Sequence, residues 1–189
     1  MLQRLFAIAL CTLALGAVSS SNARAQAATP APQGAPAPKF VSLPAKADVI
    51  LSDATITIDY CAPSMHGRTI FGGVVPYGEV WRTGANAATT LKTSSNLQIG
   101  SLTVPAGTYT LYTLPTADGW TLIVNKQTGQ WGTVYDKAQD LGRVPMSTGS
   151  NSVSVETFVI DFEKTMGSAT ELHLKWAGVD ASVQVNAVK

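Results

Sequence analysis

The residues best suited to chemistry lie close together between positions 71 and 90, where the sequence reads FGGVVPYGEVWRTGANAATT. This stretch combines aromatic side chains, an arginine, a carboxylate, an asparagine and four glycines. Glycine permits positive φ angles and a close approach of the backbone to other groups. Tryptophan and arginine are the residue types that most often anchor ligands and partners. The stretch therefore marks the expected position of a functional site, although it contains no motif of known catalytic chemistry.

The segment from Tyr77 to Asn86 predicts a binding surface. Trp81 and Tyr77 offer flat apolar faces to a sugar ring or an aromatic ligand, and Arg82 offers a planar fork to a carboxylate or a phosphate. Glu79 and Asn86 add directional hydrogen bonds. The alternative is a structural loop in which Trp81 fills the end of the fold, while Arg82 pairs with Glu79 or with main-chain carbonyl groups.

A second candidate lies just upstream, at His66 and Arg68 in the segment APSMHGRTIF (62–71). Loops often carry function, and a histidine close to Glu79 or Asp59 could form an acid–base pair or half of a metal site. The chain has two histidines, and we expect His173 on the solvated polar face of a strand. A histidine-rich metal site is therefore excluded, and no spacing supports a mixed site with carboxylates. We expect neither a metal nor a cofactor.

Downstream candidates are Asn125 and Trp131. Trp131 lies between a glutamine and a glycine, outside any clean core alternation, so it forms either an exposed platform or part of the rim of the fold, and the rim is favoured. Cys61 lies five residues before His66, but a small buried residue at a strand end is favoured over a Cys–His nucleophile. No nucleophile elbow, phosphate-binding loop or dinucleotide fingerprint is present.

The first residues predict an exported protein. A short basic start is followed by an apolar run over 5–18, which is too short for a comfortable membrane span, and by small-x-small cleavage patterns at 23–27. Residues 1–27 are therefore predicted to be a cleavable signal peptide, and the mature protein to be periplasmic or secreted without a membrane span. Residues 28–46 alternate alanine and proline, which predicts a stiff linker. A single β-rich domain is expected over 47–189.

Charge and cysteine content restrict the partners. Thirteen lysines and arginines nearly balance twelve acidic residues, and no basic cluster is present. Nucleic acids and anionic membranes are held mainly by clustered positive charge, so neither is an expected partner. Two cysteines are present, and Cys11 would leave with the signal peptide. Cys61 alone cannot form an internal disulfide, so the fold must depend on packing.

Alternating hydrophobic and polar residues predict strands throughout the domain. Examples are residues 55–60, 153–162, 170–176 and 179–187, and turn residues follow at VPAG (104–107), at 117–119 and at 177–178. Only residues 131–141 could hold a short helix. The pattern predicts an all-β fold, namely an antiparallel β-sandwich or a partly open barrel with at most one short helix.

Several strings in the domain resemble one family of exported bacterial proteins, catalogued as domain of unknown function 2911. The strings are ITIDY (56–60), GR (67–68), IFGG (70–73), VPYG (75–78), VWRTGAN (80–86), ATT (88–90), VPAGTY (104–109) and the segment 120–132. The resemblance implies a β-rich exported domain with no established activity. Its signature positions are Arg68, Phe71, Tyr77, Trp81, Arg82, Asn86, Asn125 and Trp131, and none is known to be catalytic. Ala87 replaces a usual acidic residue, and Cys61 replaces a usual small residue.

Three functions follow from these patterns. The first is a binding module for a small sugar or carboxylate-bearing molecule, whose expected ligand-binding residues are Arg68, Tyr77, Glu79, Trp81, Arg82, Asn86, Asn125 and Trp131. The second is a hydrolase or isomerase that uses Glu79 with His66 or Arg82. The third is an envelope interaction module that would present a broad apolar face. The sequence identifies no catalytic residue and indicates no oligomeric state.

Overall fold

The computed structural model describes residues 41–52 and 54–188. The expected signal peptide and residues 28–40 of the expected linker lie outside these ranges. The described elements are β1 (Leu43–Leu51), β2 (Ala54–Ala62), β3 (Thr89–Thr93), β4 (Asn96–Ile99), β5 (Leu102–Val104), β6 (Gly107–Pro115), β7 (Trp120–Asn125), the 3-10 turn η1 (Lys137–Gln139), β8 (Asp140–Met166) and β9 (Ala169–Val188). None of the described residues belongs to a helix long and apolar enough to cross a membrane.

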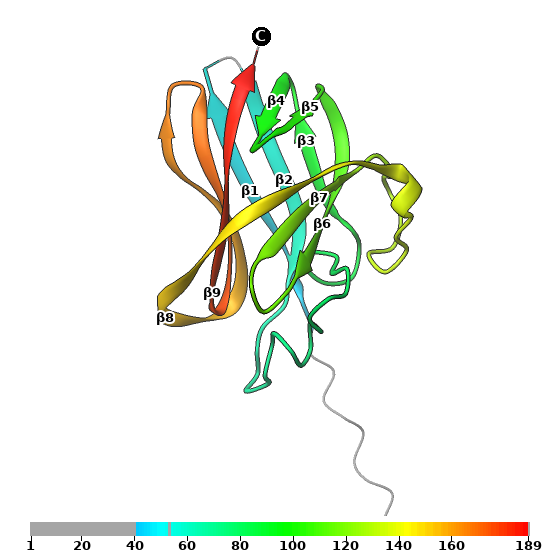
Figure 1. Cartoon of the computed structure of the whole chain (residues 1–189), viewed down its shortest axis with the longest axis vertical. Coiled ribbons are helices and arrows are strands. Elements are labelled where there is room, and N and C mark those ends of the chain that lie inside the picture. The colour runs from blue at the N-terminus through cyan, green and yellow to red at the C-terminus, as the bar shows by residue number, and fades with distance from the viewer. Residues whose placement is uncertain (1–40, 53, 189) are drawn as a thin grey trace, which may run out of the picture. The chain divides into compact units, whose positions relative to one another are not determined.

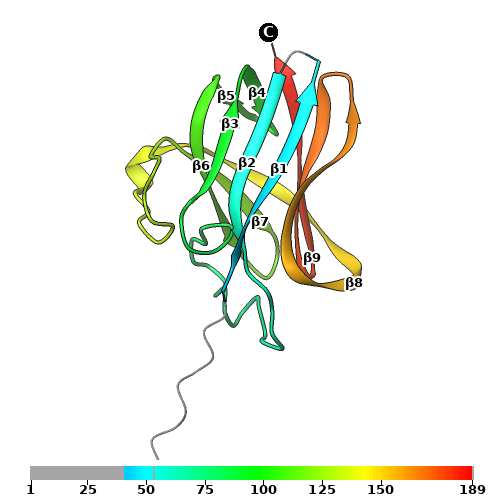
Figure 2. The same ribbon diagram turned by 180° about the vertical axis from the view of Figure 1, so that it is seen from behind.

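Every strand pairing is antiparallel, in the order β1-β2-β3-β6-β7-β8-β9-β4-β5. The long strand β8 joins two groups of strands, β1-β2-β3-β6-β7 and β9-β4-β5, because its first residues pair with β7 and later residues pair with β9 (Figure 1). Seen from behind, β6, β3, β2 and β1 lie side by side, and β1 lies next to β8 and β9 (Figure 2). The prediction of an all-β antiparallel fold with at most one short helix is confirmed.

Strand β9 reverses its direction in the middle. Ala177 has a positive φ of 51°. The amide of Ala187 donates to the carbonyl oxygen of Ser168 at 2.8 Å, and the Gln184 side chain donates to the carbonyl oxygen of Thr170 at 3.0 Å. The two halves of β9 therefore lie side by side, as the predicted strands 170–176 and 179–187 with a turn at 177–178 require.

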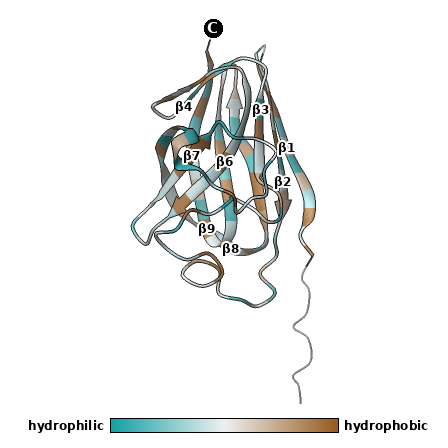
Figure 3. Ribbon diagram, turned by 90° about the vertical axis from the view of Figure 1, so that its right-hand side faces the viewer, coloured by the Kyte–Doolittle hydropathy of each residue, from teal (hydrophilic) through white to brown (hydrophobic). Residues whose placement is uncertain are grey.

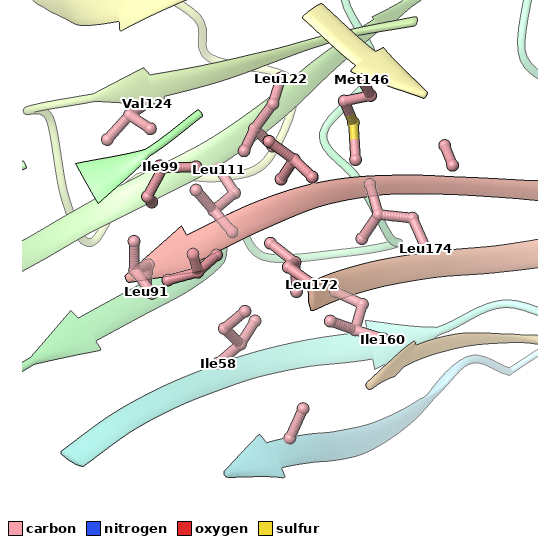
Figure 4. Close-up of a cluster of buried hydrophobic side chains, with 14 of the residues drawn as sticks. Ile58, Leu91, Ile99, Leu111, Leu122, Val124, Met146, Ile160, Leu172 and Leu174 are labelled. Carbon is pink, nitrogen blue, oxygen red and sulfur yellow. The ribbon is translucent and has the colours of Figure 1, made fainter. Parts of the chain in front are cut away.

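The core follows the predicted alternation. In β2, Ile56, Ile58 and Tyr60 are buried, and in β9 the same holds for Leu172 and Leu174. Figure 3 shows hydrophobic and hydrophilic residues interleaved along the strands, and Figure 4 shows buried hydrophobic side chains from several strands that point toward one another. Removal of this apolar surface from water is the main stabilising contribution to such a fold.

Strand β1 begins at Leu43, earlier than the domain start expected at residue 47. Leu43 pairs with Ala62, so the whole of β2 serves as a template for β1. Proline is tolerated at the beginning of an edge strand, which explains why Pro44 does not prevent the pairing. The alanine- and proline-rich composition therefore continues for several residues into the folded domain.

Candidate functional site

A cleft of about 420 Å³ lies between the long loop that joins β2 to β3 and the loop that joins β7 to β8. The first of these loops lies at the end of the domain opposite the C-terminus (Figure 1). Five of the eight expected ligand-binding residues line the cleft: Arg68, Glu79, Trp81, Arg82 and Asn86. The other three, Tyr77, Asn125 and Trp131, lie outside the lining of this cleft.

Trp81 lines the cleft and also packs against the core. Its ring stacks on Trp176, with centroids 5.7 Å apart and planes at 18°, and meets Phe158 edge-on at 5.0 Å. The indole N–H donates to the carbonyl oxygen of Gly84 at 3.1 Å. Its amide and carbonyl groups both bond with Thr113, at 2.8 and 2.9 Å. The structural alternative considered for this residue is therefore correct in part, because the ring fills the end of the fold while it also lines the cleft.

Arg82 is held along its side chain and not at its tip. An added Cβ at Gly132 would lie 2.4 Å from Arg82 Cδ and 2.7 Å from the carbonyl oxygen of Asn86, so only glycine permits this close packing. Arg82 Nε makes one long hydrogen bond, 3.4 Å, to the carbonyl oxygen of Gly84. Its two terminal nitrogens make no hydrogen bond or ion pair with any residue in 41–52 or 54–188. Of the two structural alternatives for Arg82, the pairing with Glu79 is not present, whereas a bond to a main-chain carbonyl group is present at Gly84.

Arg68 differs from Arg82, because its guanidinium is used within its own loop. Arg68 Nε donates to the carbonyl oxygen of Met65 at 2.9 Å, and Nη2 donates to that of Ser64 at 2.7 Å. These two bonds close the turn that carries His66 to the cleft. Arg68 thus contributes to the shape of the cleft wall.

Three residues that flank or line the cleft have left-handed backbone conformations. The φ angles are 48° at His66, 53° at Thr83 and 58° at Asn86. Asparagine tolerates this region, whereas a β-branched residue there is an outlier that costs about 1–3 kcal/mol. Thr83 is fully buried and is held by hydrogen bonds from Thr89 Oγ1 to its carbonyl oxygen, 2.8 Å, and between its own hydroxyl and that of Thr113, 3.2 Å. These contacts fix the turn that carries Arg82 and Asn86.

The opposite wall contains two tyrosines that the sequence analysis did not identify. Tyr112 and Tyr135 both line the cleft and meet edge-on, with centroids 4.9 Å apart. The Tyr135 hydroxyl donates to Asp140 Oδ2 at 2.7 Å, and it accepts from Arg143 Nη2 at 2.6 Å. Burial, reinforced by the hydrogen bond to the Asp140 carboxylate, raises the pKa of Tyr135 to about 12. The hydroxyl therefore stays protonated at neutral pH.

Asn125 supports this wall from behind. It is fully buried, and its amide donates to Asp140 Oδ1 and to the carbonyl oxygen of Asp136, each at 2.9 Å. Asp136 in turn caps the turn η1 by accepting from the amide of Ala138 at 2.9 Å. This turn is the short helical segment expected within 131–141. In this structure Asn125 holds the loop that carries Tyr135.

Two exposed aromatic side chains lie outside the cleft lining. Trp131 is 57% exposed and Tyr77 is 47% exposed. The exposure of Trp131 agrees with the exposed platform and not with the rim that the sequence favoured, although its backbone forms an isolated bridge with Ala87. The tyrosine packs near Gly72, where an added Cβ would lie 3.1 Å from its ring.

Glu79 and His66, the expected acid–base candidates, line the same cleft and are both exposed. The backbone amide of His66 donates to Glu156 Oε1 at 2.8 Å, which links this loop to β8. Across the described ranges, no hydrogen bond or ion pair joins the Glu79 carboxylate to His66 or to Arg82. The same ranges contain no group of three or more histidine, cysteine or acidic side chains suited to hold a metal ion.

Two other predictions concerned residues outside the cleft. His173 was expected to be solvated, and that expectation is wrong: the residue is 6% exposed, and its ring lies between Asp180, at 2.8 Å, and Glu171, at 3.2 Å. The reversal of β9 brings Asp180 against the ring, which strand alternation alone does not reveal. Cys61 is a half-buried free thiol near the end of β2, and its carbonyl oxygen accepts from the amide of Ala85 at 3.0 Å.

Comparison with known proteins places the domain in a family. No curated protein and no solved structure matches the chain. One family model matches residues 42–185, which is most of the chain and nearly all of the described domain. The chain belongs to the family described as "Protein of unknown function (DUF2911)".

Proposed function

We propose that the domain binds a small carboxylate-bearing molecule in the cleft. The observation that carries this proposal is the position of Arg82, whose side chain is packed against Gly132 while its terminal nitrogens have no partner among the described residues. A cleft of about 420 Å³ lies within the range of small-molecule sites, roughly 300–1,000 Å³. A planar guanidinium that is already positioned loses little freedom when it forms paired hydrogen bonds with a carboxylate.

The same contacts favour a carboxylate over a sugar as the recognised group. A sugar site needs an open aromatic face, but the Trp81 ring is stacked on Trp176 and surrounded by other core aromatics. The exposed rings of Trp131 and Tyr77 lie outside the cleft lining. Arg82 therefore supplies the directional contact, and the aromatic residues supply apolar surface beside it.

The test measures the binding of small carboxylates and neutral sugars to the purified protein by thermal shift and by calorimetry. We expect Arg82→Gln to weaken carboxylate binding about tenfold or more, because a hydrogen bond to a charged group contributes about 1.5–3 kcal/mol. The carboxylate affinity of Arg82→Lys should lie between those of the wild type and Arg82→Gln, since lysine keeps the positive charge but not the planar pair of N–H donors. Lys92→Gln removes an exposed charge outside the cleft and is the matched control. Carboxylate binding that survives Arg82→Gln unchanged, or sugar binding alone, would refute the proposal.

A catalytic use of the cleft is a second proposal, favoured by the presence of both Glu79 and His66 in its lining. In that case Glu79 would act as a general base in a hydrolase or isomerase once a substrate had drawn the groups together. Glu79→Gln should then abolish turnover of a bound carboxylate ester or hydroxy acid without weakening its binding. A variant that turns over substrate at the wild-type rate would exclude this role.

Export is part of the proposal as well. The predicted signal peptide supports a periplasmic or secreted location, where a domain of this kind meets small solutes. Fractionation of cells that express the full chain tests it, because retention of the intact, uncleaved protein in the cytoplasm would contradict the prediction.

A further inference from the structure

Glu79 is the charge in the cleft that binding of a simple carboxylate leaves unexplained. It is exposed, lines the cleft and lies three residues before Arg82. No hydrogen bond or ion pair engages its carboxylate within residues 41–52 and 54–188, and no distance of 4.0 Å or less joins it to the Arg82 guanidinium. Two opposite charges thus share one small cleft without neutralising each other.

The backbone that carries these two charges is fixed on both sides of Glu79. The amide of Gly78 donates to the carbonyl oxygen of Pro115 at 2.9 Å. Trp81 is bonded to Thr113 through both its amide and its carbonyl group, and its ring is locked in the aromatic cluster. These contacts fix the backbone on which both charged side chains are carried.

We infer that the ligand is a small zwitterion of the amino-acid type, with an apolar body; the inference rests on the proposed function. Its carboxylate would bind Arg82 and its ammonium group would bind Glu79. Its apolar part would lie against Trp81 and the wall that contains Tyr112 and Tyr135. A ligand with a second negative group would bring that charge towards Glu79, which disfavours dicarboxylates. The modest size of the cleft suits a single amino acid or a short peptide.

The experiment compares three probes of nearly equal shape: phenylalanine, 3-phenylpropionate, which lacks the amino group, and phenethylamine, which lacks the carboxylate. Each is titrated calorimetrically into the wild-type protein, into Glu79→Gln and into the control Asp118→Asn, which changes an exposed carboxylate outside the cleft. We expect the wild type to prefer phenylalanine over 3-phenylpropionate by about tenfold or more. Glu79→Gln should remove this preference and leave the affinity for 3-phenylpropionate within about twofold. Asp118→Asn should retain the preference.

The outcomes separate this inference from the proposed function. Equal affinity of the wild type for phenylalanine and 3-phenylpropionate, or a preference that survives Glu79→Gln, overturns selection of the amino group while carboxylate binding stands. Arg82-dependent binding of other carboxylates, with none of the three probes bound, also overturns it and leaves the proposed function intact. A protein that binds no carboxylate at all overturns both.

Discussion

The contact between Gly132 and Arg82 can be tested without knowledge of the ligand. A methyl group at position 132 would lie 2.4 Å from Arg82 Cδ and 2.7 Å from the carbonyl oxygen of Asn86. Carbon atoms do not approach so closely, so Gly132→Ala must displace the Arg82 side chain or the turn at Asn86. Forced displacement in a well-packed region costs about 1–3 kcal/mol. The loss of unfolded-state freedom on replacing glycine with alanine offsets about 0.4–1 kcal/mol of that cost.

We therefore expect Gly132→Ala to lower the free energy of unfolding by about 1–2 kcal/mol. For a domain of this size that is a fall in Tm of roughly 2–8 °C, measured by calorimetry or circular dichroism. Gly119→Ala is the matched control, because an added Cβ there meets nothing within 4 Å and φ is not left-handed. The control should melt at the wild-type temperature or slightly above it.

A double-mutant cycle then identifies the clashing group. Arg82→Ala removes the atom at 2.4 Å but leaves the Asn86 carbonyl oxygen at 2.7 Å. The cost of Gly132→Ala should therefore shrink in the Arg82→Ala background without vanishing, with a coupling energy of about 0.5 kcal/mol or more. A Gly132→Ala variant as stable as Gly119→Ala, or a cost unchanged by Arg82→Ala, would refute the packing that positions the guanidinium.

Three further predictions concern the cleft walls and the outer face. Asn86 has a φ of 58°, so Asn86→Ala should cost about 1 kcal/mol in a denaturant titration, whereas Asn86→Gly should leave stability nearly unchanged; equal stabilities would contradict this. Asp140→Asn should lower the pKa of Tyr135 from about 12 towards 10, as measured by absorbance against a Tyr135→Phe reference, and an unchanged titration would exclude the hydrogen bond as a cause. The hydrogen bond from Lys175 lowers the pKa of Glu163 below its ordinary 4.5. This ion pair therefore stabilises the fold above pH 4.5, and the stabilisation is lost as the pH falls through the lower pKa of Glu163 in the folded state. The Tm difference between wild type and Glu163→Gln should accordingly narrow in acid, and a difference independent of pH would argue against the ion pair.

Local signals in the sequence were sufficient for most of the fold. The alternation of Ile56, Ile58 and Tyr60 specifies which face of β2 is buried, because side chains of a strand point alternately to its two sides. The turn VPAG (104–107) likewise specifies the break between β5 and β6. Both signals involve neighbours along the chain, so no knowledge of tertiary contacts is needed to interpret them.

Features that depend on distant segments could not be predicted in this way. The start of β1 is decided by its pairing with β2, and the burial of His173 is decided by the reversal of β9 that places Asp180 beside it. Tyr112 lies within an ordinary strand pattern, and only the returning loop that carries Tyr135 makes it part of a cleft. Sequence patterns identify which residue types are available, but they do not identify which of them converge.

The hydrogen-bond pattern separates the expected ligand-binding residues into two physical groups. The side chains of Arg68 and Asn125 are occupied by main-chain oxygens or by a carboxylate, and Trp81 is packed in the core. A purely structural loop explains these three residues completely. It does not explain why Arg82, which lines the cleft, is packed along its stem while its terminal nitrogens make no hydrogen bond or ion pair with a described residue, Glu79 included.

These two groups should respond differently to substitution. Replacement of Trp81 or Asn125 removes buried contacts and should lower Tm whether or not ligand is present. Arg82→Gln affects only the long hydrogen bond from Nε to the carbonyl oxygen of Gly84, 3.4 Å, and Glu79→Gln removes no hydrogen bond or ion pair with a described residue, so both should leave the Tm of the free protein nearly unchanged. Only the stabilisation added by ligand should then disappear, which distinguishes a binding site from scaffolding by a comparison within one protein.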